Sequence, residues 1–477
     1  MKRSHWLLVV GLGVMAFMLD PEPVNAGEGP SSGRQNVLFI AIDDLNHWVG
    51  YLGRNPQTIT PNIDALARRG VWFSRSYCAA PSCNPSRAAL MSGLRPSTSG
   101  VYDNNNDWRT AIGEDLPLTT AFRKAGYGVY GAGKIYHGSF PRLSEWDDYL
   151  GDEGREPQPQ GDTGVGGIKF APLDCEDSDM QDFRIVNYGI EQLGKRHEKP
   201  FFLAVGLHKP HMPWNVPRKY YDMHPLDEIQ LPPHREGDLL DLPAAGVRMA
   251  RPEGDHATML ASGRWKEAVQ AYLATITFCD AMVGRLVKAF DDSAYRDNTI
   301  VVLWGDHGWH LGEKEHWRKF ALWEEATRAP LIWIAPGLTK ADGRCDRPVD
   351  FMSIYPTLAD LCGIPIPSHV EGKSIRTLLA DPTAPWDPPA VTTYKYRNHA
   401  VRSADWRYIR YADGGEELYD ESSDPYEWTN LAAQAEHASR KSELGQWIPE
   451  KNQPDIGGQP PAGEKQGQRA KARNRAR

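Results

Sequence analysis

Three short apolar runs along the chain each lead directly into polar residues. The runs are Val37–Ile42, Phe201–Val205 and Ile300–Trp304. They are followed by Asp43-Asp44, by His208-Lys209-Pro210-His211 and by Asp306-His307, respectively. Continuous apolar runs of this length are typical of strands that are buried on both faces of a largely parallel sheet. Because ligands of open α/β sheets gather beyond the carboxyl ends of the strands, we expect the three polar clusters to meet at one edge.

A long stretch in the second half of the chain has helical periodicity. Apolar side chains recur at helical spacing at Val269, Tyr272, Leu273, Ile276, Val283, Leu286, Val287 and Phe290. This pattern predicts an amphipathic helix. Cys279 falls on its apolar face, so we expect that thiol to be packed in the core.

The residue composition of the chain changes after the proline-rich stretch around 382–389. Val391–Tyr396 and Trp406–Tyr411 are rich in aromatic and β-branched residues, and Asp413-Gly414-Gly415 is a turn signal. We therefore predict an α/β domain over 27–385, with a large mixed, mostly parallel sheet flanked by helices. A smaller α+β domain with an antiparallel sheet should cover 386–450. The stretch 451–477 is basic and rich in Gly, Pro and Gln, which favours a solvated disordered tail over a segment that tethers a polyanion.

The amino terminus has the form of an export signal. Lys2 and Arg3 precede an apolar run from Trp6 to Leu19, and Val24-Asn25-Ala26 has the small-residue form of a cleavage site. The run is too short for a membrane span, and no later segment approaches that length. The sequence therefore predicts a signal peptide over 1–26, cleaved near Ala26, and a mature protein that is periplasmic or secreted and not membrane-spanning.

Composition and charge exclude several classes of protein. The chain has 477 residues, of which 40% are hydrophobic and 24% charged, an ordinary globular balance. Its net charge of −8 gives no general attraction to nucleic acid, so an anionic substrate would need a local basic pocket. The six cysteines are scattered and form no C-x-x-C pair, which argues against a disulfide scaffold and against a cysteine zinc site.

One short motif indicates a reactive group. In Cys83-Asn84-Pro85-Ser86-Arg87, Asn84 is a favourable helix cap and Pro85 suits a first helical turn. Cys83 would then lie beside a helix N-terminus, where backbone N–H groups favour an anion, and it becomes a candidate nucleophile. The alternative is a thiol that simply packs near the start of a helix.

The same motif carries a family resemblance. Cys83-x-Pro85-Ser86-Arg87, followed by Leu90, Ser92 and Gly93, resembles the signature of the type I sulfatases. The second signature of that family is matched by Gly126-Tyr127-Gly128-Val129 and Gly133-Lys134-Ile135-Tyr136-His137. Through His208-Lys209-Pro210-His211 and Asp306-His307-Gly308-Trp309, the chain most resembles the branch of iduronate-2-sulfatase and its bacterial relatives. The resemblance spans nearly the whole mature chain.

The resemblance implies a fold, an activity and a modified nucleophile. The fold would be alkaline-phosphatase-like. The activity would be hydrolysis of sulfate esters on a sulfated carbohydrate, such as a 2-O-sulfated uronic acid or a related polysaccharide unit. A formylglycine-generating enzyme, also called a sulfatase-maturing enzyme, would convert Cys83 to formylglycine, whose hydrated aldehyde is the nucleophile of this family.

The resemblance also implies a metal site. Its ligands would be Asp43, Asp44, Asp306 and His307, together with the oxygen of modified Cys83. Three carboxylates indicate a hard cation, and the family implies Ca²⁺, with Mg²⁺ as the alternative. His307 stands where many sulfatases have Asn, as it does in the iduronate branch.

Matching the family position by position assigns the remaining catalytic roles. Arg87 would support the formylglycine diol, and His137 would assist its deprotonation and collapse. Lys134 and Lys319 would hold sulfate oxygens, because a sulfate ester carries negative charge throughout the reaction. His211 would act as the acid for the departing sugar alcohol.

The specificity residues follow less directly from the sequence. Trp108, Arg109, Trp309 and His310 are candidates for the sugar pocket, since aromatic faces pack on sugar rings and Arg pairs with a uronate carboxylate. Core packing or ordinary surface exposure explains each of them equally well.

Two alternatives to a sulfatase stay open at this stage. The same kind of site can receive a phosphoryl group, which would make the protein a formylglycine-dependent phosphonate or phosphodiester hydrolase. If Cys83 is unmodified, the protein would instead bind sulfated glycans without cleaving them.

Overall fold

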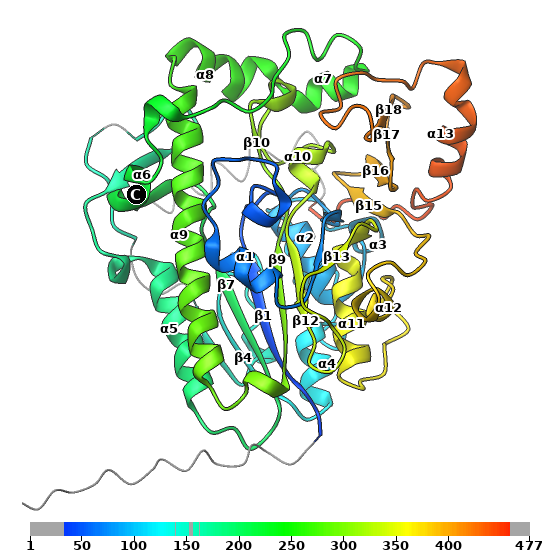
Figure 1. Ribbon diagram of the computed structural model, residues 1–477. Coiled ribbons are helices and arrows are strands. Elements are labelled where there is room, and N and C mark those ends of the chain that lie inside the picture. Colours follow the sequence, from blue (N-terminus) through cyan, green and yellow to red (C-terminus); the bar gives the residue numbers. More distant parts are fainter. Residues whose placement is uncertain (1–32, 139, 152–155, 162, 458–477) are drawn as a thin grey trace, which may run out of the picture.

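A central eight-stranded sheet organises the computed structural model, which describes residues 33–138, 140–151, 156–161 and 163–457 (Figure 1). The strand order is β13-β2-β12-β9-β1-β7-β4-β5, and among these strands β12 alone runs antiparallel to its neighbours. The strands are β13 (Gly343–Cys345), β2 (Val71–Phe73), β12 (Leu331–Ile334), β9 (Thr299–Gly305), β1 (Asn36–Ile42), β7 (Phe201–Leu207), β4 (Gly128–Gly133) and β5 (Asp148–Leu150). The predicted signal peptide lies outside the described residues.

The three predicted apolar strands are neighbours at the middle of this sheet. β1 pairs in parallel with β9 on one side and with β7 on the other. Every residue of the three strands is buried, as expected for strands covered on both faces. Successive β1 side chains alternate between two cores, with Leu38 and Ile40 in one and Val37 and Phe39 in the other.

Helices cover both faces of the sheet. One core is closed by α1 (Pro61–Ala67), α5 (Gln181–Gly194) and the long helix α9 (Trp265–Asp292), and the other by α2 (Cys83–Ser92), α4 (Leu118–Lys124) and α11 (Ile354–Leu361) (Figure 1). The helix predicted from periodicity is therefore confirmed as α9. Cys279 is completely buried on its apolar face, also as predicted.

A second, four-stranded antiparallel sheet follows late in the chain. Its order is β15 (Ala390–Thr393), β16 (His399–Arg402), β17 (Trp406–Arg410) and β18 (Glu416–Asp420). α13 (Ala438–Gly445) packs on its outer face, and its inner face packs on the segment that includes α10 (Glu324–Thr327) (Figure 1). The expected strand over Val391–Tyr396 stops at Thr393, because Lys395 and Arg397 adopt positive φ angles that turn the chain into β16.

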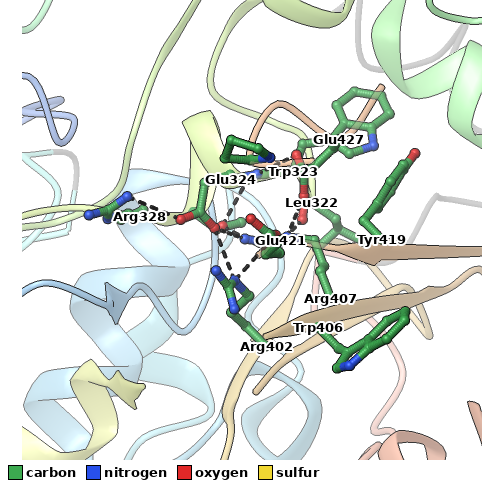
Figure 2. A network of polar contacts seen from close by, with 12 residues as sticks. Leu322, Trp323, Glu324, Arg328, Arg402, Trp406, Arg407, Tyr419, Glu421 and Glu427 are labelled. Atoms are coloured by element: carbon green, nitrogen blue, oxygen red, sulfur yellow. Dashed lines mark hydrogen bonds and ion pairs between the residues drawn. The ribbon is translucent and has the colours of Figure 1, made fainter. Parts of the chain in front are cut away.

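A buried network of charges joins the small sheet to α10 (Figure 2). The Arg407 guanidinium contacts the carboxylates of Glu324, Glu421 and Glu427, and none of these four side chains is more than 4% exposed. Arg402 adds contacts to Glu324 and Glu421 at 3.3 and 3.2 Å. Charges buried this completely require close partners, so the network fixes how the small sheet sits on α10.

The last described residues pack on the large domain. Gln453 N donates to the Ser97 carbonyl at 2.8 Å, and Ile456 N donates to the Gly100 carbonyl at 3.1 Å. The predicted disordered tail therefore does not begin at Lys451, because residues 453–456 have hydrogen-bond partners at α3 (Pro96–Ser99), at Gly100 and at Asn106. Residues 458–477 lie outside the described part. Within the part of the chain that the structure describes, no helix combines the length and the apolar composition of a membrane span.

Candidate active site

The carboxyl ends of the central strands bring the predicted polar residues to one place. Asp43 and Asp44 follow β1, Asp306 follows β9 and Lys134 follows β4. Backbone bonds continue the ladder into these residues, since Asp43 N donates to Leu207 O at 3.2 Å and Lys134 N donates to Gly206 O at 2.8 Å. The predicted meeting of the clusters at one edge is thus confirmed, and neighbouring parallel strands are its cause.

Cys83 enters the same place from the start of α2. The helix begins at Cys83, with Ser82 as the residue before it, so Cys83 lies at the helix N-terminus as predicted. Asn84, however, does not cap the helix. Its side-chain amide instead donates to the carbonyls of Asp103 and Asn106 at 2.9 and 2.8 Å, and its side-chain oxygen has no partner. Asn84 therefore anchors the loop at 103–106 beside Cys83.

Arg87 links three parts of the site from within α2. It lies one helical turn after Cys83, and its side chain is completely buried. Its Nε donates to Asp306 Oδ2 at 2.9 Å, and its Nη2 donates to Asp43 Oδ1 at 3.1 Å. A guanidinium with two carboxylate partners has a fixed orientation, so Arg87 holds α2 and the two strand ends in register.

Two buried lysines face the Cys83 thiol and the neighbouring aspartates. Lys319 Nζ lies 2.9 Å from Cys83 Sγ and 2.6 Å from Asp44 Oδ1, and Lys134 Nζ donates to Asp43. Burial and the Asp43 charge would raise the pKa of Cys83, but Lys134, Lys319 and His307 together hold that pKa well below its ordinary value. The surroundings of Cys83 therefore favour an anion.

The acidic residues form a cluster that suits a divalent cation. One ligand atom from each of Asp43, Cys83, Asp306 and His307 lies within 4.8 Å of the others. Burial raises the pKa of Asp306 to about 7 against the effect of its cationic neighbours, and the buried Asp44 Oδ2 has no hydrogen-bond partner. Asp306 thus has too little positive charge around it, and carboxylates are the usual ligands of a hard cation, so these residues fit a metal site.

The three predicted histidines are placed differently. His307 is completely buried, and its Nδ1 lies 3.0 Å from the Gly308 carbonyl, which leaves Nε2 directed at Asp44 Oδ1 at 3.3 Å and at Cys83 Sγ at 3.4 Å. His211 Nε2 lies 3.8 Å from Asp44 Oδ2, and its side chain is 37% exposed. His137 lies three residues after Lys134 and has a buried Nδ1 without a partner. His211 is thus the histidine at the open side of the site.

The predicted sugar-binding residues require a correction. Trp108 is 1% exposed because its ring stacks on Tyr136 at 4.4 Å, and Trp309 is 1% exposed because it packs on Trp214. His310 is also completely buried. Neither indole is available to a sugar ring, so core packing is the correct interpretation for them. Arg109 is exposed and pairs with Asp107 at 2.8 Å.

Two residues that shape the site were not predicted. Ser86 Oγ donates to the carbonyl of Asp306 at 2.5 Å, which ties α2 to the end of β9. Tyr272 Oη donates to the carbonyl of Asp44 at 2.7 Å from the long helix α9. The only sequence feature that could have indicated Ser86 is its place inside the Cys83 motif. The helical pattern marked Tyr272 as apolar, and the sequence has no signal for its hydroxyl contact.

Comparisons with known proteins give two family matches. The sulfatase family model matches residues 35–364, and the model of the C-terminal part of N-sulphoglucosamine sulphohydrolase matches residues 312–453. A sulfatase of Formosa agariphila is 38% identical over 94% of this chain and 92% of its own length. The human iduronate 2-sulfatase is 29% identical over 78% of this chain and 84% of its own length.

The fold is also similar to that of solved structures. The phosphonate monoester hydrolase of Agrobacterium radiobacter superposes with a TM-score of 0.75, at 23% identity, over 87% of this chain and 94% of that one. The predicted architecture, a large mostly parallel sheet with a smaller antiparallel sheet after it, is confirmed as alkaline-phosphatase-like.

Proposed function

Because this chain belongs to the sulfatase family and is a sulfuric ester hydrolase, we propose that it removes sulfate from a 2-O-sulfated uronic acid or a related unit of a sulfated polysaccharide. The observation that carries the proposal is the position of Cys83. It is buried at the start of α2, among two lysines and an acidic cluster. The likeness to human iduronate 2-sulfatase supports the sugar class.

We propose that the nucleophile is made from Cys83. A formylglycine-generating enzyme would convert its thiol to an aldehyde before the chain folds, because Cys83 is completely buried afterwards. One hydroxyl oxygen of the hydrated aldehyde attacks sulfur, and the bond between sulfur and the sugar oxygen breaks. The second hydroxyl then loses its proton, the bond from carbon to the sulfated oxygen breaks, and sulfate leaves with that oxygen as the aldehyde is restored. Arg87 and the two lysines already favour an anion here, so the same groups suit an ionised aldehyde hydrate.

Asp43, Asp44, Asp306 and His307 would hold the metal ion together with the oxygen of modified Cys83. A bound Ca²⁺ or Mg²⁺ supplies positive charge that offsets the charge of the sulfate oxygens and of the nucleophile. The Gly308 carbonyl accepts from Nδ1 of His307, which orients Nε2 toward the cluster. A histidine that binds a metal through one ring nitrogen commonly donates a hydrogen bond from the other.

The remaining residues act on the sulfate group and the leaving alcohol. Lys134 and Lys319 donate to nonbridging oxygens, and their burial strengthens this interaction because little water competes. His137 accepts the proton of the aldehyde hydrate during collapse. His211 donates a proton to the bridging oxygen from the open side of the site.

The proposal is tested by measuring release of inorganic sulfate from a panel of sulfated glycans by protein produced with a formylglycine-generating enzyme. The same preparation is assayed on phosphate monoesters, phosphodiesters and phosphonate esters. Preferred turnover of the phosphorus esters would make the protein a phosphonate or phosphodiester hydrolase. Glycan binding without turnover by fully modified protein would make it a binder.

We also propose that the mature enzyme is exported. The support is the amino-terminal pattern around Lys2, Arg3 and Ala26. Sequencing the amino terminus of protein recovered outside the cytoplasm tests this, with a first residue near Gly27 as the expected result. Recovery of only cytoplasmic protein that still begins at Met1 would contradict it.

A further inference from the structure

A polar cavity of about 620 Å³ lies beside the candidate active site. Three segments that are far apart in the sequence form its walls. They are the end of α7 (Ala244–Ala250) with the turn at Arg251–His256, the segment Arg318–Phe320 after β11 (Trp317–Arg318), and the loop Tyr394–Asn398 between β15 and β16. The last segment belongs to the small antiparallel sheet, which therefore contributes one wall of the cavity.

Two walls of the cavity are connected directly to the catalytic residues. Phe320 follows Lys319, whose Nζ lies 2.9 Å from Cys83 Sγ. Lys395 pairs with Asp103, and the Asp103 carbonyl accepts from the Asn84 amide at 2.9 Å. The ring of Phe320 also lies 5.7 Å from Lys319 Nζ, so this wall of the cavity is next to the lysine that contacts Cys83.

Most cations on the cavity wall already have an acidic partner. Arg318 pairs with Asp255 at 2.6 Å, and Lys395 pairs with Asp103. Among the described residues, the Arg251 guanidinium has neither a hydrogen bond nor an ion pair, and Arg251 is exposed. Its positive charge is available to a ligand.

The backbone of Arg251 gives a second reason to assign it a role. Arg251 ends α7 in the left-handed region, with φ 52° and ψ 55°. Helix ends in this conformation favour Gly or Asn, because a side chain with a Cβ is disfavoured there. An arginine at this position has a conformational cost that no contact of its guanidinium with the described chain offsets.

The charge of Arg251 acts on two other groups that line the cavity, Tyr394 and His316. Burial raises the pKa of Tyr394, and the Arg251 charge opposes that rise from the facing wall. Burial also lowers the pKa of His316, and Arg251 adds to this effect. Arg251, Tyr394 and His316 all line the cavity, so the charge of Arg251 belongs to the same cavity lining as these two groups.

The apolar part of the lining suits a sugar ring. The rings of Phe320 and Tyr394 are 6.1 Å apart and tilted by 34° on two different walls. Aromatic faces of this kind pack on the C–H faces of sugars, while a cation binds a carboxylate or a sulfate. The cavity therefore offers one aromatic contact area and one unpaired guanidinium beside the sulfate site.

We propose that this cavity binds the acidic sugar residue next to the sulfate ester that is cleaved, with Arg251 pairing with a carboxylate or a second sulfate of that residue. The inference rests on the proposed function, since it assumes a sulfated polysaccharide substrate. It adds a specificity residue outside the family motifs. It also provides the local basic pocket that a chain of net charge −8 needs for an anionic substrate.

The test compares substrates that do and do not reach the cavity. We would measure kcat/KM of the parent and of Arg251→Ala for a disulfated disaccharide of a 2-O-sulfated uronate and a sulfated glucosamine, and for 4-nitrophenyl sulfate. We divide kcat/KM for the disaccharide by kcat/KM for 4-nitrophenyl sulfate. Loss of a charge-assisted bond predicts that this ratio is about 10- to 100-fold lower in Arg251→Ala than in the parent. The ratio for Arg251→Lys should lie between that of the parent and that of Arg251→Ala, because lysine keeps the charge without the forked geometry.

A matched control and two modified ligands identify the contact. Arg440→Ala removes the same charge from α13, which does not line the cavity, and Arg440 pairs with Glu443 at 2.6 Å, so the ratio should stay that of the parent. If the effect of Arg251→Ala disappears with a carboxyl-reduced disaccharide, the partner is the carboxylate of the uronate that carries the cleaved ester, which would overturn the assignment to the neighbouring residue. If it disappears with a disaccharide that lacks the glucosamine sulfate, the partner is that sulfate.

Three further outcomes would overturn the inference. They are an equal loss on both substrates, no loss on either, and an equal effect of Arg440→Ala. If the parent hydrolyses no sulfate ester, the proposed function fails. In that case, calorimetry measures the Kd of the disulfated disaccharide for the parent and for Arg251→Ala, and this comparison still tests whether the cavity binds the sugar. An increase in Kd of about tenfold or more in the variant supports it, and an unchanged Kd refutes it. Thermal melting of each variant confirms that it is folded.

Discussion

Replacing His211 with alanine tests a proposed catalytic group whose side chain is 37% exposed. Its Nδ1 lies within hydrogen-bonding distance of the Met212 carbonyl, and a carbonyl accepts only from N–H. Nε2 therefore faces the site, 3.8 Å from Asp44 Oδ2. A proton on Nε2 is what the ring can donate to a leaving oxygen.

The expected loss depends on the leaving group. A sugar alcohol is a much weaker acid than 4-nitrophenol, so its departure needs a proton whereas that of nitrophenolate does not. General acid catalysis contributes about 10²- to 10³-fold in such a case, which corresponds to about 3–4 kcal/mol of barrier. We expect His211→Ala to lower kcat/KM by that factor for a sulfated sugar and by less than about tenfold for 4-nitrophenyl sulfate.

The assay is sulfate release from both substrates across a range of pH, with His234→Ala as the control. His234 is an exposed histidine whose Nδ1 likewise lies on a carbonyl, that of Pro232 at 3.0 Å, but it is not among the candidate site residues. His234→Ala should leave both activities as in the parent. Equal losses on the two substrates after His211→Ala would refute the role of this residue as an acid, and would indicate that it only binds the sulfate.

Four further outcomes are expected. Cys83→Ala should abolish turnover, and mass spectrometry of the tryptic peptide Ser76–Arg87 should show an aldehyde at Cys83 in the parent; full turnover without Cys83 would exclude it as the source of the nucleophile. Exhaustive chelation should remove activity and added Ca²⁺ or Mg²⁺ should restore it, so persistent activity of metal-free protein would contradict the metal site. Arg407→Met leaves three buried carboxylates without their central partner and should lower the free energy of unfolding in urea by about 3–5 kcal/mol, whereas a change below about 1 kcal/mol would show that the network adds little. Burial lowers the pKa of His399 from 6.5 to about 4, so on acidification the unfolded chain binds the proton before the folded chain does. The free energy of unfolding therefore falls as the pH drops from about 6.5 to 4, and His399→Gln should remove at most about 3 kcal/mol of this pH dependence. An unchanged pH profile of stability in the variant would contradict this.

Local patterns in the sequence determined much of the fold. The runs that became β1, β7 and β9 are apolar throughout because both of their faces are covered, and such runs can be recognised without knowing what covers them. The helical spacing around Cys279 likewise predicted α9 and the burial of that thiol. The short strand β16 was missed, because its position depends on the turn that Lys395 and Arg397 make after β15.

The candidate catalytic residues were also accessible from the sequence, though only in part from physical patterns. Strand ends indicated Asp43, Asp44 and Asp306, and the helix start indicated Cys83. Lys319 was assigned by family resemblance alone, since nothing in its local sequence shows that it will lie 2.9 Å from Cys83 Sγ.

Other features were decided by the tertiary structure. A sequence does not show which side chain will cover another, so Trp108 and Trp309 fitted a sugar pocket as well as they fitted a core until their packing on Tyr136 and Trp214 was known. The cavity at Arg251 has walls from three distant segments, and no local pattern joins them. Strand ends and helix faces follow from the order of residues along the chain, whereas burial, pairing and cavities depend on which distant segments come together.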